Sequence, residues 1–324
     1  MKNRSALFLI AFVITAIVGV VIIQINLEKR DGKPQYTIGI IQTTSHPALD
    51  LAREGFIKTL TERLGTSVDF VHFNAYGSYS QIQTIAKNFH ENQTVNLICA
   101  LGTPAAQAIA EFEKEKPIIV AAVSDPHELG LAYNQTNITG SSDMTDPSYH
   151  INYLKQLMPQ VKTVAIMYTA VEQNSRMISK KLIDAMLAAG LNPLEIVFDA
   201  DSTLYAAIDN ALHNADVLFI PTDNTLSSMI QTITQRASKT KKPIWVCDNA
   251  LISFPGIIAS YGIDYETNGM QAAIAAFEIL TYQKKPYEIA IAHAPKDILL
   301  VNKKTLKELN LKIPNDLEPW IKLI

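Results

Sequence analysis

The chain has 324 residues, of which 48% are hydrophobic and 18% are charged, and its formal net charge is −3. This length suits two globular domains or one large one, and the composition excludes a disordered chain. Lys and Arg form no run or stripe, so nucleic acid is not an expected partner. His and Cys do not cluster at the spacing of metal ligands, and we expect neither a metal nor another cofactor.

The N-terminal segment differs in kind from the rest of the chain. Lys2 and Arg4 precede an apolar run from Ala6 to Ile25, which is long enough to cross a bilayer as a helix. The run has no small-x-small cleavage site, and no cysteine follows that could carry a lipid. We therefore interpret residues 1–30 as a transmembrane anchor, with a cleaved signal peptide as the alternative. Either reading places the remaining chain on the periplasmic or extracytoplasmic side of the cytoplasmic membrane.

After a short polar linker, β-rich runs alternate with amphipathic helices. In chain order, the first half predicts strands at 36–41, 67–73, 95–100, 117–122 and 138–140. The helices predicted between them run through 49–60, follow the cap at Ser78, and cover 104–112. Cys99 falls in one of these strands, and Cys247 follows a strand of the second half. We expect both to be buried, reduced thiols.

The second half repeats this alternation. Asp146 and Pro147 open a helix, a strand follows at 163–168, and Gly190 ends the next helix. Further strands are predicted at 194–198, 216–220, 243–246, 256–260 and 297–301, with helices at 204–212, 226–237 and 267–280. Such alternation predicts an α/β fold with two doubly wound parallel-sheet lobes. We divide the chain into lobe 1 (36–143 plus 252–294) and lobe 2 (144–251 plus 295–324).

Polar side chains gather just after the predicted strands. In doubly wound sheets, ligands bind outside the carboxyl ends of the strands, so the cleft between two such lobes is the expected site. The candidate binding residues at these junctions, together with one aromatic side chain, are Ser45, His46, Gly102, Thr103, Ser124, Asp125, Asn174, Ser175, Asp223, Asn224, Asp248, Asn249 and Tyr261. The alternative for each polar residue is an ordinary helix cap or turn.

These junctions suit capture of an amino acid or a similar zwitterion. The turn at Gly102 and Thr103 opens a helix, whose free N–H groups can hold a carboxylate. Asp125, Asp223 and Asp248 can receive an ammonium group, and Tyr168 or Tyr261 can line the cleft.

The order of the junction motifs resembles that of a known family, the tryptophan/tyrosine-type substrate-binding proteins of ABC transporters. The resemblance runs from about residue 36 to 314. The segments that carry it are TSHPALD (44–50), LGTPAAQ (101–107), AAVSDP (121–126), NITGSSD (137–143), EQNS (172–175), WVCDN (245–249) and ASYGIDY (259–265).

This resemblance implies a type I periplasmic-binding fold with three crossovers between the lobes. It also implies hinge closure around a small polar ligand, with an amino acid as the expected class and an aromatic one as the narrower expectation, and delivery to ABC permease subunits in the membrane. It assigns the cleft to the junction residues given above, apart from His46 and Tyr261. Many relatives are lipoproteins or soluble, whereas this chain keeps an apolar N-terminal segment, so a membrane-anchored ligand sensor remains an alternative.

An enzyme is the remaining alternative. Ser45, His46 and Asp50 are close in sequence, but neighbours in sequence do not make a hydrolase triad, and the chain has no GxSxG elbow. No P-loop or GxGxxG motif follows a strand. We therefore expect no catalytic activity.

Overall fold

The computed structural model describes residues 34–131, 136–199, 203–293 and 297–324. Residues 36–324 form a compact unit. The expected anchor or signal segment at 1–30 lies outside the described residues. Within the described ranges, no helix combines the length and apolarity that a bilayer span requires.

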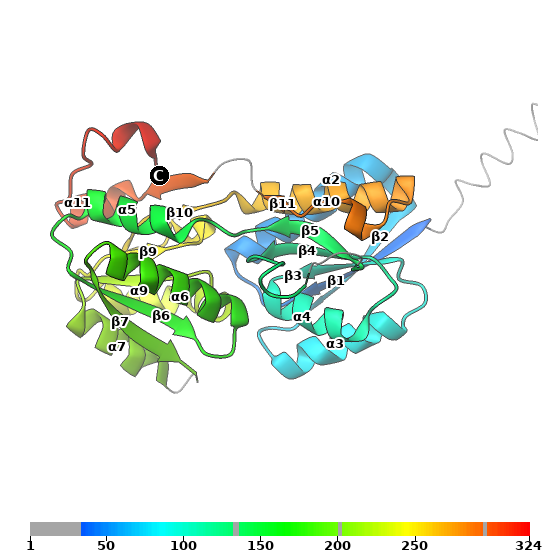
Figure 1. The fold of residues 1–324 in the computed structure, drawn as a ribbon, viewed down its shortest axis with the longest axis horizontal. Helices are drawn as coiled ribbons and strands as arrows, with labels where there is room; N and C mark the ends of the chain where they lie inside the picture. The colour runs from blue at the N-terminus through cyan, green and yellow to red at the C-terminus, as the bar shows by residue number, and fades with distance from the viewer. Residues whose placement is uncertain (1–33, 132–135, 200–202, 294–296) are drawn as a thin grey trace, which may run out of the picture. The chain divides into compact units, whose positions relative to one another are not determined.

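The first lobe is built on a six-stranded sheet (Figure 1). Its strands, in spatial order, are β11 (Ala292–His293), β5 (Ile138–Ser142), β4 (Ile118–Val123), β3 (Leu97–Leu101), β1 (Tyr36–Gln42) and β2 (Val68–Asn74). All pairings are parallel. Gln42 at the end of β1 lies opposite both Asn74 and Leu101, so three strands end at the same edge of the sheet.

Helices cover both faces of this sheet. One face packs against α2 (Pro47–Leu64) and α10 (Tyr265–Tyr282), and the other against α3 (Tyr79–Glu91) and α4 (Thr103–Phe112). Phe56 of α2 and Phe89 of α3 are fully buried on opposite faces. β3 and β4 are buried along their whole length, which explains their uninterrupted apolar sequences.

The second lobe has a seven-stranded sheet. Its strands, in spatial order, are β13 (Ile321–Leu323), β12 (Ile298–Val301), β10 (Ile257–Gly262), β9 (Ile244–Val246), β8 (Val217–Ile220), β6 (Thr163–Thr169) and β7 (Asn192–Phe198). β10 and β12 run antiparallel. The chain passes from β11 of the first lobe to β12 without an α-helix between these two strands in the described residues, so β12 is not the product of a parallel crossover within the second sheet. The other pairings are parallel.

This sheet is also covered on both faces. The helices, in chain order, are α5 (Pro147–Leu157), α6 (Gln173–Ala188), α7 (Leu204–Asn214), α8 (Asn224–Ser228), α9 (Ile230–Ala237) and α11 (Lys303–Glu308). α5 and α6 lie on the face that buries Trp245, and α7, α8 and α9 lie on the other. The predicted helix 226–237 is two helices, since Met229 leaves the helical conformation between them.

The chain crosses between the lobes three times, after β5, after β10 and after β11. Our division placed 252–294 in lobe 1, but β10 hydrogen-bonds to β9 and β12 in the second sheet. The second crossover therefore follows Gly262. The predicted fold class of two parallel-sheet α/β lobes is confirmed, and Cys99 and Cys247 are buried free thiols, as expected.

Candidate functional site

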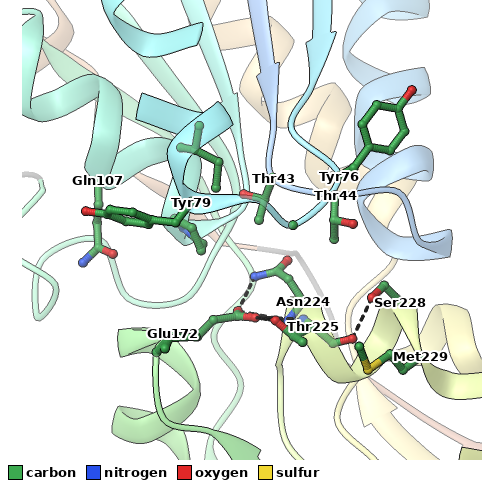
Figure 2. A pocket seen from close by; sticks show the side chains of 14 residues that line it. Thr43, Thr44, Tyr76, Tyr79, Gln107, Glu172, Asn224, Thr225, Ser228 and Met229 are labelled. Atoms are coloured by element: carbon green, nitrogen blue, oxygen red, sulfur yellow. Dashed lines mark hydrogen bonds between the residues drawn. The ribbon is translucent and has the colours of Figure 1, made fainter. Parts of the chain in front are cut away.

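A cavity of about 640 Å³ lies between the carboxyl ends of the strands of the two lobes. The first lobe contributes Thr43, Thr44, Tyr76, Gly77, Tyr79, Ile82, Pro104 and Gln107, and the second contributes Val171, Glu172, Asn224, Thr225, Ser228 and Met229. Figure 2 shows the two sets facing each other across the cavity. No Lys or Arg is among these lining residues, so the described wall carries one carboxylate and no basic side chain.

The strand order explains this location. In the first sheet β1 lies between β2 and β3, and in the second β6 lies between β7 and β8. Successive connections leave such a central strand in opposite directions, which opens a crevice at its carboxyl end. Thr43 and Thr44 follow β1, whereas Val171 and Glu172 follow β6. The cavity therefore joins the topological switch points of both lobes.

The first-lobe wall is held by the backbone around Thr43. Its amide N donates to the Leu101 carbonyl at 3.1 Å, and its hydroxyl donates to the same carbonyl at 3.0 Å. The Gly77 amide donates to the Thr43 carbonyl at 2.9 Å. The loops after β1, β2 and β3 are thus tied together at the cavity.

Two tyrosines on this wall are largely exposed. Tyr76 is 75% exposed and Tyr79 is 66% exposed. Tyr76 has φ of 50°, a left-handed conformation that is rare for an aromatic residue. Its amide donates to Asn74 Oδ1 at 2.8 Å, which helps to hold this strained turn. Strain of this kind concentrates at binding sites. In Figure 2 the Tyr79 ring lies toward Gln107, whereas the Tyr76 ring is turned away from the second lobe.

Glu172 is the charged centre of the second-lobe wall. It occupies the N-cap position of α6 but does not cap that helix. One carboxylate oxygen accepts from the Thr225 amide at 2.8 Å and its hydroxyl at 2.7 Å. The other accepts from the Asn224 amide at 3.0 Å and its side-chain Nδ2 at 2.7 Å. Glu172 therefore fixes the turn that opens α8.

Burial and, to a lesser extent, the nearby Asp223 carboxylate raise the pKa of Glu172 to about 7, and the hydrogen bonds from Thr225 and Asn224 limit this rise. Glu172 is only 4% exposed, yet it borders the cavity. A buried carboxylate in this position favours a positively charged group on a ligand, because such a group would offset the cost of its desolvation.

His46 reaches across from the first lobe. Its side chain is 4% exposed, and Nε2 lies 3.3 Å from Asn224 Oδ1 of the second lobe. Nδ1 lies 3.9 Å from Asp248 Oδ2. Burial lowers the pKa of the His46 imidazole to about 4, so the ring is neutral at physiological pH. His46 is therefore a contact between the lobes.

A second, very small cavity of about 10 Å³ lies beneath this contact. His46, Asp223, Asn224 and Asp248 all border it, so the fold brings four of the predicted site residues together here. Burial raises the pKa of Asp248 to about 7 and also raises that of Asp143, another wall residue.

The remaining predicted residues of the first lobe do not border the large cavity. Ser45 is exposed and donates to Asp50 at 2.7 Å, and Ser124 donates to Asp143 at 2.7 Å. Asp125, with φ of 46°, accepts from the Glu128 amide at 3.0 Å. Gly102 and Thr103 lie at the start of α4, where Thr103 is buried.

The predicted residues of the second lobe act mostly within the fold. Ser175 donates to Asp223 at 2.6 Å, and Asp223 caps α8 through the Leu226 amide at 2.8 Å. Asn174 donates to the Thr222 carbonyl at 3.1 Å. Asn249 donates to the Gly262 carbonyl at 2.8 Å, next to the second crossover.

The two tyrosines expected in the cleft lie elsewhere. Tyr261 packs in an aromatic cluster with Tyr149 and Tyr153 and donates to Asp297 at 3.0 Å. Tyr168 hydrogen-bonds Glu195. Both side chains are buried within the second lobe, and neither borders the large cavity.

Of the predicted set, Asn224 alone borders the large cavity, and Glu172, Tyr76, Tyr79 and Thr225 were missed. The same rule that found the other candidates would have found them. Tyr76 comes two residues after β2, and Glu172 comes three after β6. The predicted set favoured residue types that also cap helices, and it therefore left out the aromatic and acidic residues of the same loops.

The hydrolase alternative finds no geometric support among these residues. The Ser45 hydroxyl is bonded to Asp50, whereas the His46 ring points to Asn224 and Asp248 in the other lobe. Serine and histidine therefore face different partners, and His46 cannot act as the base for Ser45 in this arrangement.

Residues 37–319 match the ABC transporter substrate binding protein family. This match covers most of the chain, and the protein belongs to that family. It is therefore a member of a solute-binding family, not of an enzyme family, and the resemblance carried by the junction motifs is confirmed.

Individual relatives agree with this assignment. A tyrosine-binding protein of Clostridioides difficile is 32% identical over 292 residues, which cover 88% of this chain and 84% of the relative. The crystal structure of an ABC domain in complex with L-Trp from Streptococcus pneumoniae is 27% identical, with a TM-score of 0.84, over 89% of this chain and 99% of that one. The ligand-free, open structure of a substrate-binding protein with adhesive properties from Clostridium difficile is 30% identical with the same coverage, and its TM-score is 0.66.

Proposed function

We propose that this protein is the extracytoplasmic solute-binding component of an ABC importer and that it captures an amino acid between its lobes. The observation that carries the proposal is the cavity at the switch points of both sheets, walled by both lobes. A ligand that contacts both walls stabilises the closed form through its differential affinity for that form. Delivery to permease subunits follows from the family.

The lining points to the class of ligand. Glu172 is the carboxylate that suits an ammonium group, and the absence of Lys and Arg from the described wall disfavours anionic solutes. Tyr76, Tyr79 and Met229 offer flat or polarizable apolar surface for a planar side chain. The Thr44 hydroxyl faces the cavity and can donate to a ligand carboxylate, whereas the Thr43 hydroxyl already donates to the Leu101 carbonyl. An aromatic amino acid combines these three properties.

The comparisons support this proposal. One relative is named for tyrosine, and one similar structure holds L-Trp. The TM-score is higher with the L-Trp complex than with the ligand-free, open structure, although the latter is more identical in sequence. Sequence divergence does not account for this difference, and the order of the two scores supports lobes that close around a ligand.

A thermal-shift screen of the full chain against the twenty amino acids tests the proposal. A ligand that binds only the folded state adds about 2.7 kcal/mol of stability at one hundred times its Kd. We expect a saturable rise in Tm with L-tyrosine or L-tryptophan and none with L-glutamate or L-aspartate, because Glu172 repels a second carboxylate. A shift with acidic amino acids alone would contradict the assigned ligand class.

The alternative is a membrane-anchored sensor that binds the same ligand without transport. It depends on the apolar run at 6–25, which lies outside the described residues. Uptake of the labelled amino acid by cells with and without the gene separates the two functions. Unchanged uptake, together with specific binding, would favour the sensor.

A further inference from the structure

His46 has no local role that requires a histidine. It precedes α2 at the N-cap position with an extended backbone, where Ser, Thr, Asp or Asn would cap the helix. Its side chain makes no capping hydrogen bond, and Pro47 begins the helix. The imidazole instead leaves its own lobe and is buried against Asn224 and Asp248.

The hydrogen-bond pattern sets the tautomer of this ring. The Nδ2 group of Asn224 donates to Glu172 at 2.7 Å, so Asn224 Oδ1 is the acceptor that faces His46. His46 Nε2 must then carry the hydrogen and donate it, at 3.3 Å. Nδ1 is left as an acceptor, and it has no hydrogen-bond partner among the described residues.

Asp248 faces this bare nitrogen. Its Oδ2 lies 3.9 Å from His46 Nδ1, and both groups border the small cavity. Two acceptors in such contact repel unless a proton or a water lies between them. Burial raises the pKa of Asp248 to about 7, which keeps part of this carboxyl protonated near neutral pH. Asp143 and Tyr265 border the same cavity, and Asp50 acts on the His46 ring from α2.

Gly102 shows that the lobes approach closely at the same point. A Cβ at this position would lie 2.8 Å from Thr43 Oγ1 and 3.2 Å from Asn224 Oδ1. The backbone of Gly102 has φ of 86°, which also favours glycine. Two residues of the first lobe, Gly102 and His46, therefore lie against the side chain of Asn224.

We propose that His46 is a positioning residue for ligand binding: it latches the first lobe onto Asn224, whose amide in turn holds the Glu172 carboxylate at the large cavity. The inference rests on the proposed function for the identity of its ligand, but the latch itself is a property of the two lobes. One chain of hydrogen bonds, from His46 to Asn224 and from Asn224 to Glu172, therefore links closure of the lobes to the orientation of the Glu172 carboxylate.

The interlobe distance tests the latch without any ligand. Lys87 on α3 and Asn210 on α7 are exposed and can be changed to cysteine for spin labelling, since Cys99 and Cys247 are buried. In the full chain, we expect His46→Leu to shift the distance distribution toward longer values. His46→Gln should restore the shorter distances, because its amide can donate to Asn224 Oδ1.

Ligand kinetics give the second readout, with L-tyrosine and L-tryptophan as probes. Loss of the donor leaves a buried acceptor on Asn224 unsatisfied, so His46→Leu should dissociate the probe about tenfold faster, which corresponds to ~1.4 kcal/mol. The association rate should change by less than about twofold, because the latch forms after encounter. His90→Leu, a change to a half-exposed histidine on α3, is the matched control and should alter neither readout.

Three results would overturn the latch. The first is a His46→Leu chain with wild-type distances and wild-type dissociation. The second is a His46→Gln chain as impaired as His46→Leu, since ring packing and not hydrogen-bond donation would then be responsible. The third is a wild-type chain that never populates the short distance. If neither amino acid binds while the interlobe distances change as expected, the proposed ligand class is rejected and the contact between His46 and Asn224 is supported.

Discussion

At the scale of single residues, this protein concentrates buried polar groups where its two lobes meet. Glu172, Asp248 and Asp143 are each at most 5% exposed, and burial raises the pKa of each. His46 is the imidazole among them, and its pKa is lowered by the same cause. Burying such groups without partners carries a desolvation cost. In the described chain these groups lie where a bound ligand and closure of the lobes can offset that cost.

We expect Glu172 to make ligand affinity depend on pH. An ammonium group at the cavity favours the ionised carboxylate, whose pKa in the folded protein is about 7 instead of the usual 4.5. Below pH 7 the ligand must displace a proton, so affinity should fall by up to about tenfold per pH unit between pH 7 and pH 5 and level off above pH 7.5. Calorimetric titration with L-tyrosine across pH 5–8.5 measures this.

Glu172→Gln should bind roughly tenfold more weakly at pH 8 and lose the pH dependence, because a charge-assisted contact is removed. Glu308→Gln, an exposed carboxylate on α11, is the control and should match the wild type. An unchanged pH profile in Glu172→Gln would assign the titration to another group, such as Asp248.

At the scale of elements, α2 and α10 pack unusually closely on the first sheet. A Cβ on Gly269 of α10 would lie 1.9 Å from the Ala52 carbonyl oxygen, and one on Gly55 of α2 would lie 2.2 Å from the Glu266 carbonyl oxygen. The two glycines face the partner helix reciprocally, so both backbones approach where no side chain intervenes. This pair of helices carries the turn at His46 and the second crossover.

Gly269→Ala should therefore lower the free energy of unfolding by about 3 kcal/mol, since the methyl group meets backbone that cannot move aside. Urea denaturation followed by circular dichroism measures the change. Thr281→Ala, an exposed position on the same helix, should stay within about 0.5 kcal/mol of the wild type. Equal stability of Gly269→Ala and the wild type would show that the helices can separate freely.

At the scale of the whole molecule, each lobe has its own core on both faces of its own sheet. The apolar clusters beneath α2 and α10 and beneath α3 and α4 belong to the first lobe, and those of Trp245 and Phe198 belong to the second. The lobes meet through polar contacts such as His46 with Asn224 and Lys181 with Glu128, and Met177 and Ala250 of the second lobe pack against the edges of the first-lobe clusters. Folding of one lobe is therefore only partly coupled to folding of the other.

Calorimetry should show this partial coupling. We expect the ligand-free protein to unfold in two overlapping transitions, because two domains with separate cores need not melt together. A saturating amino acid that contacts both lobes should raise the two transitions and merge them, since it is lost when either lobe unfolds. A single transition that no bound probe shifts would contradict both the lobe-wise cores and the shared site.

Local pattern determined a large part of this fold. Uninterrupted apolar runs such as those of β3 and β4 predicted buried parallel strands, and the cap at Ser78 marked the start of α3 within one residue. These features depend on burial and on hydrogen bonds to neighbours in the chain, which the sequence records directly. The ordered junction motifs likewise identified the family.

The site and the lobe boundary depended on contacts between distant segments, and there the sequence was less informative. β10 reads as a strand of either lobe, because its apolar residues suit any buried sheet, and only its pairing with β9 and β12 places it. Polar residues after strands look alike in sequence, whether they cap a helix, as Asp223 does, or wall the cavity, as Glu172 does. Closing two lobes decides which side chains face each other, and that choice lies in the tertiary structure alone.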